Sequence, residues 1–341
     1  MLLPANLQHK NREKMVKKPD RLQPETLPRA TGRPKALGAL RALGHSPAAA
    51  FRQLLVVAGL AAVFAGSAGQ PGLAAEPQTR QARTSLQATS GWTTTRRLAT
   101  PHATQAAAAD ASHLYAISST TVARFDRRTG RLLDTASSPS AQHLNSGFLH
   151  DGRMYLAHSN YPATPHASDI RMYIPGEERL QLYHVFPDPP GSLVWCIRRA
   201  GNWWCCFAHY GAENHRTCLI EYADGGLERE RRRWLFPEQV IADFDGMSAS
   251  GGIWDGDTLL ASHHHFPVLY RLRLPGPTEP PERLILAETL HCPFPGQGFA
   301  IDLGHLEMPG KRPWLVGIDR PGRTVVVARP DTGPNPSPGS D

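Results

Sequence analysis

The chain of 341 residues is long enough for one large domain or two small ones, and 37 Lys and Arg against 30 Asp and Glu give it a net charge of +7. The positive excess lies in residues 1–52, which hold 11 basic and 3 acidic residues, whereas residues 53–75 carry no charge. Residues 76–341 therefore hold 26 basic and 27 acidic residues. Because binding to a phosphate backbone needs an excess of Lys and Arg, we expect no nucleic-acid partner for this part of the chain.

An apolar run of 12 uncharged residues, 54–65, follows Arg52 and leads into a stretch of small residues. The run is short for a membrane-spanning helix, which needs about 20 apolar residues. A basic flank, a short apolar core and a small-residue exit are typical of a secretory signal. We therefore expect cleavage near Ala74 or Ala75, a linker over residues 76–91, and a secreted or periplasmic protein. The alternative is that residues 54–65 remain as a membrane anchor.

Five cysteines follow the predicted signal: Cys196, Cys205, Cys206, Cys218 and Cys292. In an exported protein these thiols can form disulfides, and an odd number leaves at least one unpaired. A two-residue turn at Ala200-Gly201 would place Cys196 opposite Cys205, and a slip of one residue would place it opposite Cys206. Cys218 on the next strand competes for the same partner. We expect at most one disulfide here, with a cluster of buried thiols as the alternative.

Short apolar runs broken by turn residues fill the chain between residues 104 and 330, and no long stretch shows a helical period of 3.6 residues. This pattern predicts an all-β fold. A unit of up to four strands recurs five times, which indicates a repeat architecture. In three units the first strand leads into a turn, centred on Asp151-Gly152, Ala200-Gly201 and Asp255-Gly256. The units begin 40, 47, 58 and 47 residues apart, at Gln105, Asn145, Ser192, Ser250 and Gln297.

A polar fourth strand closes each of the first four units, over residues 131–137, 179–186, 230–236 and 283–290. The fifth unit lacks such a strand before the Pro/Gly/Ser-rich tail, which spans residues 331–341. Residues 92–100 can supply it from the N-terminal side, and this exchange would close a ring of blades without an open edge. We therefore predict a five-bladed propeller over residues 92–330, with the leader and signal of residues 1–75 outside it.

This four-strand repeat resembles the β-propeller superfamily, broadly the gluconolactonase-like and NHL-type propellers. The resemblance covers about two thirds of the chain and is one of pattern, with no motif that carries catalytic residues over position by position. It implies the fold, and a propeller fold by itself does not define a function.

Propeller topology predicts which residues share a face of the molecule. The first strand of each blade starts on one face and the second strand returns to it, so entry residues and second-strand ends meet around the central channel. This places a polar pocket at Asn145, Ser159, Asn160, Ser192, Ser250, Gln297, Asp319 and Arg320.

Histidines are concentrated at the same strand ends: His143, His158, His209, His263 and His264. Converging neutral imidazoles are natural ligands for a transition metal, so we expect one divalent metal ion as a possible cofactor. A ligand pocket without metal and a purely structural role are the alternatives. Strand alternation allows only one of His263 and His264 to point inward, and the sequence does not decide between them.

Several enzyme classes lack support in the sequence. No G-x-S-x-G elbow is present, and Asp319 is the only acid among the predicted pocket residues, which argues against a glycosidase carboxylate pair. We hypothesise an exported enzyme of hydrolase, lactonase or isomerase type that binds a metal or a small ligand. The alternative is a non-catalytic propeller that binds a small polar ligand or a partner protein of the cell envelope. The body is expected to be a monomer that does not enter a membrane.

Overall fold

The computed structural model describes residues 88–89, 91–223, 226–305 and 311–331, all within one compact unit, Gln70–Asp341. The predicted leader and signal, nearly all of the predicted linker and residues 332–341 lie outside the described residues. In the part of the chain that is described, no helix is long and apolar enough to cross a membrane.

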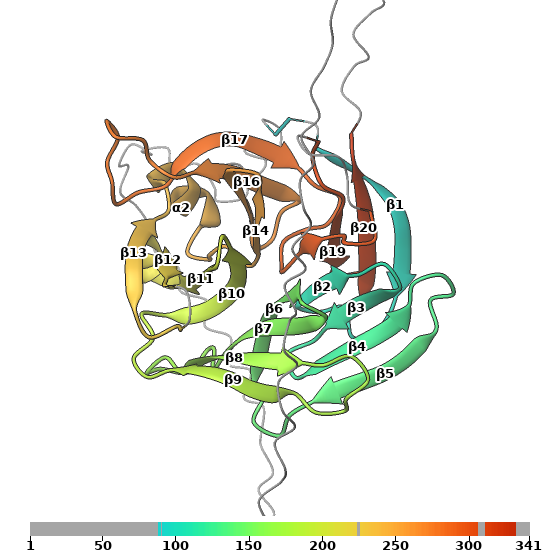
Figure 1. The fold of residues 1–341 in the computed structure, drawn as a ribbon. Helices are drawn as coiled ribbons and strands as arrows, with labels where there is room; N and C mark the ends of the chain where they lie inside the picture. Colours follow the sequence, from blue (N-terminus) through green and yellow to red (C-terminus); the bar gives the residue numbers. More distant parts are fainter. Residues whose placement is uncertain (1–87, 90, 224–225, 306–310, 332–341) are drawn as a thin grey trace, which may run out of the picture. The chain divides into compact units, whose positions relative to one another are not determined.

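The described residues form five four-stranded antiparallel sheets arranged in a ring, which confirms the five-bladed β-propeller (Figure 1). The first blade is made of β2 (Ala106–Ala109), β3 (His113–Ile117), β4 (Thr121–Asp126) and β5 (Leu132–Ser137). The second is made of β6 (His143–His150), β7 (Arg153–Ser159), β8 (Ser168–Tyr173) and β9 (Gln181–Phe186). The third is made of β10 (Ser192–Arg199), β11 (Asn202–Ala208), β12 (Cys218–Tyr222) and β13 (Glu230–Leu235). The fourth is made of β14 (Gly252–Asp255), β15 (Thr258–Ser262), β16 (Val268–Arg273) and β17 (Ile285–His291).

The fifth blade joins the two ends of the propeller. It contains β18 (Ala300–Ile301), β19 (Leu315–Asp319) and β20 (Thr324–Pro330), and its outer strand is β1 (Trp92–Ala99). In Figure 1, β1 runs beside β20, and the pairing extends from Trp92 opposite Pro330 to Ala99 opposite Thr324. The predicted ring closure by residues 92–100 is therefore confirmed. It removes the open sheet edge that the fifth blade would otherwise present.

Two of the three predicted hairpin turns lie where expected. Both residues of Asp151-Gly152 and of Ala200-Gly201 have positive φ, as the tight two-residue turns of β-hairpins require. The third prediction, a turn centred on Asp255-Gly256, is wrong by one residue. Asp255 pairs with Thr258, so the loop consists of residues 256–257, and Gly256 takes the positive φ of 60°.

Two short helices interrupt the β pattern and were not predicted. The 3-10 helix η1 (Gly211–Arg216) lies between β11 and β12, and α2 (Glu238–Phe244) lies between β13 and β14. The helix α2 buries Val240, Ile241 and Phe244. Its position accounts for the widest of the unit spacings, the 58 residues between Ser192 and Ser250.

The hydrophobic core lies mainly between neighbouring blades. One buried cluster joins Ile170 of β8 to Phe207 of β11, and another joins Leu269 of β16 to Val326 of β20. Burial of such side chains supplies the main favourable term in folding. The innermost strand β2 is a run of four alanines, all fully buried, since the crowded channel leaves little room for larger side chains there.

All five cysteines are buried and free. Cys196 pairs across the hairpin with Cys205, the register that the Ala200-Gly201 turn predicts, whereas Cys206 lies opposite Trp195. Burial raises the pKa of Cys218 to about 11 and that of Cys292 to about 12, so these thiols stay protonated and weakly reactive. Of the two expectations from the sequence, one disulfide or only buried thiols, the structure therefore shows buried thiols.

Candidate functional site

A polar cavity of about 190 Å³ lies where the innermost strands begin, on the face that the topology predicts. All five blades contribute to it through strand entries or through the residues that follow second strands. We call it the mouth cavity. Its lining consists of Gln105, His143, Asn145, Tyr161, Val194, Tyr210, Ser250, His264, Gln297 and Arg320.

The structure brings some of the predicted site residues together in this cavity: Asn145, Ser250, Gln297, Arg320, His143 and His264. Four lining residues were not among the predicted pocket residues: Gln105, Val194, Tyr161 and Tyr210. Of these, the repeat pattern places Tyr210 on the same face, directly after His209. Gln105 had a usable signal, because it opens the first unit in the same position as Asn145 in the second. Tyr161 and Tyr210 lie in loops beyond the second strands, where strand alternation no longer predicts direction.

Ser250 and His264 form the shortest polar contact between two lining residues, with 2.7 Å between Ser250 Oγ and His264 Nδ1. Burial is the largest cause of the lowered pKa of His264, and together with the neighbouring charges of His265 and Arg320 it brings that pKa to about 3. The imidazole is therefore neutral at physiological pH, and in the tautomer with a proton on Nε2 the serine hydroxyl donates to Nδ1.

Three amide side chains hold the cavity wall in place. Nδ2 of the buried Asn145 donates to the carbonyl of Leu193 at 2.7 Å. Nε2 of Gln105 donates to Ser119 Oγ at 3.1 Å. Nε2 of Gln297 makes a longer contact of 3.4 Å with the carbonyl oxygen of His264, so its amide is the least tightly bound of the three.

Aromatic rings form one side of the cavity. The ring centroids of His143 and Tyr161 lie 5.2 Å apart, and those of Tyr161 and Tyr210 lie 4.6 Å apart. Burial raises the pKa of Tyr210, so its hydroxyl remains a neutral hydrogen-bond donor. Such a wall offers a flat apolar surface to a ligand, together with polar edges.

The charge of the lining is one-sided, because Arg320 is its only side chain with a permanent charge and no Asp or Glu is present. Within the described part of the chain, Arg320 has no side-chain hydrogen bond or ion pair, and its charge contributes to the lowered pKa of His143 and His264, for both of which burial is the largest cause. Asp319, a predicted pocket residue, does not line the cavity and pairs with Arg97 at 3.1 Å. The mouth cavity therefore has a positive field.

Three predicted metal ligands lie outside the cavity. His158 is held by Asp169, 2.9 Å from Nδ1, and by the backbone N–H of Gln142, which donates to Nε2 at 2.9 Å. Both ring nitrogens of His263 are also occupied, Nε2 by the carbonyl of Asp243 at 3.0 Å and Nδ1 by backbone N–H groups.

His209 is buried beside His166, with ring centroids 5.7 Å apart. Among the residues that the structure describes, no group of three or more His, Cys, Asp or Glu side chains is arranged to hold a metal ion. The predicted cluster of five histidines thus divides into His143 and His264 in the mouth cavity and three side chains held elsewhere.

The remaining predicted pocket residues support loops and strands near the cavity. The buried hydroxyl of Ser159 lies 3.4 Å from Asn145 Nδ2. Asn160 stabilises the loop after β7 through hydrogen bonds to Pro165 and Ala167. Ser192 Oγ lies 3.4 Å from His166 Nδ1, a second and longer serine–histidine contact outside the cavity.

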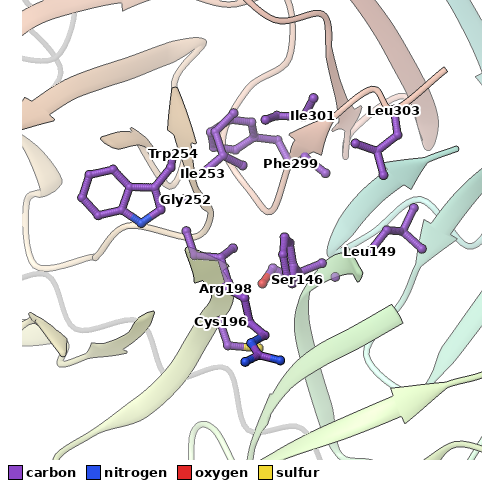
Figure 2. Close-up of a pocket in the computed structure, with 14 residues that line it drawn as sticks. Ser146, Leu149, Cys196, Arg198, Gly252, Ile253, Trp254, Phe299, Ile301 and Leu303 are labelled. Carbon is purple, nitrogen blue, oxygen red and sulfur yellow. The ribbon is translucent and has the colours of Figure 1, made fainter. Parts of the chain in front are cut away.

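A second cavity, of about 140 Å³, lies further along the same innermost strands and is mainly apolar. Figure 2 shows Phe299, Ile253 and Leu149 from different blades around it, with Cys196 and Arg198 of β10. The sequence analysis did not predict this cavity. The strands β6 and β10 thus carry lining residues of both cavities. His143, Asn145 and Val194 line the mouth cavity, and Phe148, Leu149 and Ile197 line the second cavity.

Comparison with known proteins gives only a remote likeness. No family model matches the chain, and no curated protein matches it. Among solved structures the chain is similar to the WD40 domain of Toxoplasma gondii coronin, at 11% identity and a TM-score of 0.35. The match covers 67% of this chain and 55% of that chain. Nothing about activity, ligands or partners follows from this likeness, and membership of the gluconolactonase-like or NHL-type propellers remains a prediction.

Proposed function

We propose that this propeller binds a small organic anion, most simply a carboxylate, in the mouth cavity. The observation that carries the proposal is the lining itself, in which Arg320 is the one permanent charge and carboxylates are absent. A guanidinium group presents paired N–H donors that match a carboxylate or a phosphate. A cation without a counter-charge among the described lining residues, beside partly buried neutral imidazoles, favours an anionic ligand over a neutral or cationic one.

The size and chemistry of the lining limit the ligand further. A cavity of ~150 Å³ accepts benzene, so about 190 Å³ suits a molecule of about eight non-hydrogen atoms. Tyr161 and Tyr210 provide a surface for a flat or ring-shaped part of the ligand. The amide of Gln297 and the hydroxyl of Ser250 provide hydrogen-bonding groups for hydroxyls or carbonyls. We therefore propose a compact carboxylic acid with further polar groups.

Isothermal titration calorimetry with a panel of small carboxylates, and with inorganic phosphate as a competing anion, tests this proposal. Arg320→Gln should weaken the best carboxylate at least about tenfold, since a hydrogen bond to a charged group contributes roughly 1.5–3 kcal/mol. Arg329→Gln, which removes an exposed arginine of the same blade outside the cavity, is the matched control and should change affinity less than about twofold. Equal effects of the two substitutions would contradict the proposal, and tighter binding of phosphate would assign the site to phosphates.

We also propose that the chain is exported, on the basis of the apolar run of residues 54–65 and the small residues after it. Expression in a secreting bacterial host, followed by intact-mass measurement of the exported protein, should give a chain that begins near Ala75 or Glu76. Recovery of a cell-associated chain that retains residues 54–65 would contradict export by cleavage and favour the membrane anchor.

A further inference from the structure

The contact between Ser250 and His264 has a geometry that anion binding alone does not need. A serine hydroxyl 2.7 Å from an imidazole nitrogen, in a cavity open to small molecules, is the arrangement of a nucleophile beside its general base. We propose that Ser250 is an acyl-accepting nucleophile, activated by His264, and that the protein hydrolyses a small carboxylic ester that carries an anionic group. This inference rests on the proposed function in one respect, because it assigns Arg320 to hold the anionic group of the ester.

Tight packing fixes the backbone that directly follows the serine. A Cβ atom at Gly251 would lie 2.9 Å from the ring of Phe299, and one at Gly252 would lie 2.6 Å from the ring of Trp195. The carbonyl of Gly251 also accepts a hydrogen bond of 3.0 Å from the backbone N–H of Ser262. Ser250 is therefore attached to a part of the chain that has little freedom to move, which favours a defined position of Oγ.

His264 is held from the other side. The backbone around its carbonyl is packed closely against Gly296, where a Cβ atom would lie only 1.7 Å from the carbonyl oxygen. Gln297 Nε2 contacts the same oxygen at 3.4 Å. Among the described residues, the side-chain amide of Gln297 makes only this long contact, and it lines the cavity. Its N–H is therefore available to donate to the oxygen of a bound ester carbonyl.

The reaction balances with water as the only co-reactant. Oγ of Ser250 attacks the ester carbon, its proton passes to Nδ1 of His264, and the carbon–oxygen bond to the alcohol breaks as that alcohol takes the proton from Nδ1. Water then attacks the acyl-serine and gives a proton to Nδ1. The bond between the acyl carbon and Oγ breaks, Oγ recovers a proton, and the carboxylic acid leaves.

The groups around His264 give this reaction an unusual pH dependence. Burial is the main cause of its lowered pKa of about 3, and the charges of His265, Arg320, His263 and His143 act in the same direction. A base with so low a pKa is weak, so we expect slow turnover. The same base remains unprotonated in mild acid, so the rate of acylation should stay nearly constant between pH 7 and pH 5. A histidine with the ordinary pKa of about 6.5 would lose most of its activity over that range.

Covalent labelling of the full-length protein tests the proposal directly. An alkyl fluorophosphonate reacts with an activated serine as Oγ bonds to phosphorus and fluoride leaves. Intact-mass spectrometry should show one label per chain, and peptide mapping should place it on Ser250. Labelling should disappear in Ser250→Ala and slow at least about 100-fold in His264→Gln, in line with the usual contribution of a general base. The same variants should lose hydrolysis of a 4-nitrophenyl ester of a small dicarboxylic acid.

Ser192→Ala is the matched control, because Ser192 also lies beside a histidine but at 3.4 Å and outside the cavity. Its labelling rate should stay within about twofold of that of the unmodified protein. Carboxylate binding by the unmodified protein, measured by calorimetry, separates failure of this inference from failure of the proposed function. Circular dichroism and the melting temperature show whether each variant is folded. No label, a label on another residue, or an equal rate in His264→Gln would each overturn the proposal.

Discussion

The carboxylate of Asp302 is fully buried between the first and fifth blades and joins them. It accepts hydrogen bonds of 2.6 and 2.5 Å from the guanidinium of Arg127, and His305 Nδ1 lies 2.9 Å from the same carboxylate. Burial alone would raise the pKa of Asp302, but the hydrogen bonds from Arg127 and His305 outweigh this effect and lower it. The charged form is therefore the one that the folded state stabilises.

We expect Asp302→Asn to destabilise the propeller by about 1–3 kcal/mol, because it leaves the partly buried guanidinium of Arg127 without its counter-charge. Urea unfolding at pH 7 measures the change. Asp257→Asn is the control: this fully exposed carboxylate also pairs with an arginine, Arg199, and its loss should leave the unfolding midpoint nearly unchanged. Equal shifts of the unfolding midpoint in the two variants would show that the Asp302–Arg127 ion pair contributes no more to stability than a surface ion pair.

The pH dependence of the same interaction has a defined sign. The pKa of Asp302 is lower in the folded protein than in the unfolded chain. Its carboxylate therefore contributes fully to the free energy of unfolding above the pKa of the unfolded chain, about 3.9. This contribution is lost as the pH falls through the pKa of the folded protein. The stability difference between the unmodified protein and Asp302→Asn should therefore narrow in acid. A difference that widens as the pH falls would contradict this assignment.

The sequence could not choose between His263 and His264, and the structure shows why. The strand β15 ends at Ser262, so the rule that neighbours alternate between faces does not reach either histidine. His263 is instead held by the carbonyl of Asp243 in α2, a helix that the sequence analysis did not predict. His264 contacts Ser250 through a turn geometry that spacing does not encode. Side-chain direction was predictable only within regular strands.

At the level of the elements, the strands were largely predictable because short apolar runs, buried almost throughout in β7 and β11, lie between recognisable turns. The strand β13 (Glu230–Leu235) lies within the predicted range of residues 230–236, and β20 pairs with β1 as ring closure requires. The helix α2 was not predictable in the same way. Its seven residues are too few to show a clear helical period, and its position depends on packing against the third and fourth blades.

Removal of β1 gives the sharpest test of how the strands are arranged, because β1 closes the ring of blades. A chain that lacks residues 1–99 should expose the edge of β20, whose residues Val325, Val326 and Val327 are buried in the complete propeller. We expect this chain to melt at a lower temperature and to associate through the exposed edge, as measured by thermal unfolding and by light scattering after gel filtration.

A synthetic peptide of residues 92–100 provides the control, because it should pair with β20 and restore both the melting temperature and the monomeric state. A truncated chain that remains monomeric with an unchanged melting temperature would show that β1 is not needed for closure. A truncated chain that the peptide fails to rescue would indicate that the loss arises elsewhere in the deleted segment.

For the propeller as a whole, the channel has two chemically different regions along the same innermost strands. The mouth cavity is polar, positive and lined by neutral imidazoles, whereas the cavity in Figure 2 is mainly apolar. Repeat topology predicted that strand entries from several blades would meet. It could not predict the apolar region, because that depends on how Phe299 and Ile253 pack in three dimensions.

The most direct test of the central claim is a crystal structure of the protein with the carboxylate that binds most tightly in calorimetry. We expect the carboxylate group to lie against the guanidinium of Arg320, with the rest of the ligand between Tyr161 and the Ser250–His264 pair. Electron density for the ligand in the apolar cavity, or on the outer surface with Arg320 unoccupied, would contradict the assignment of the mouth cavity as the binding site.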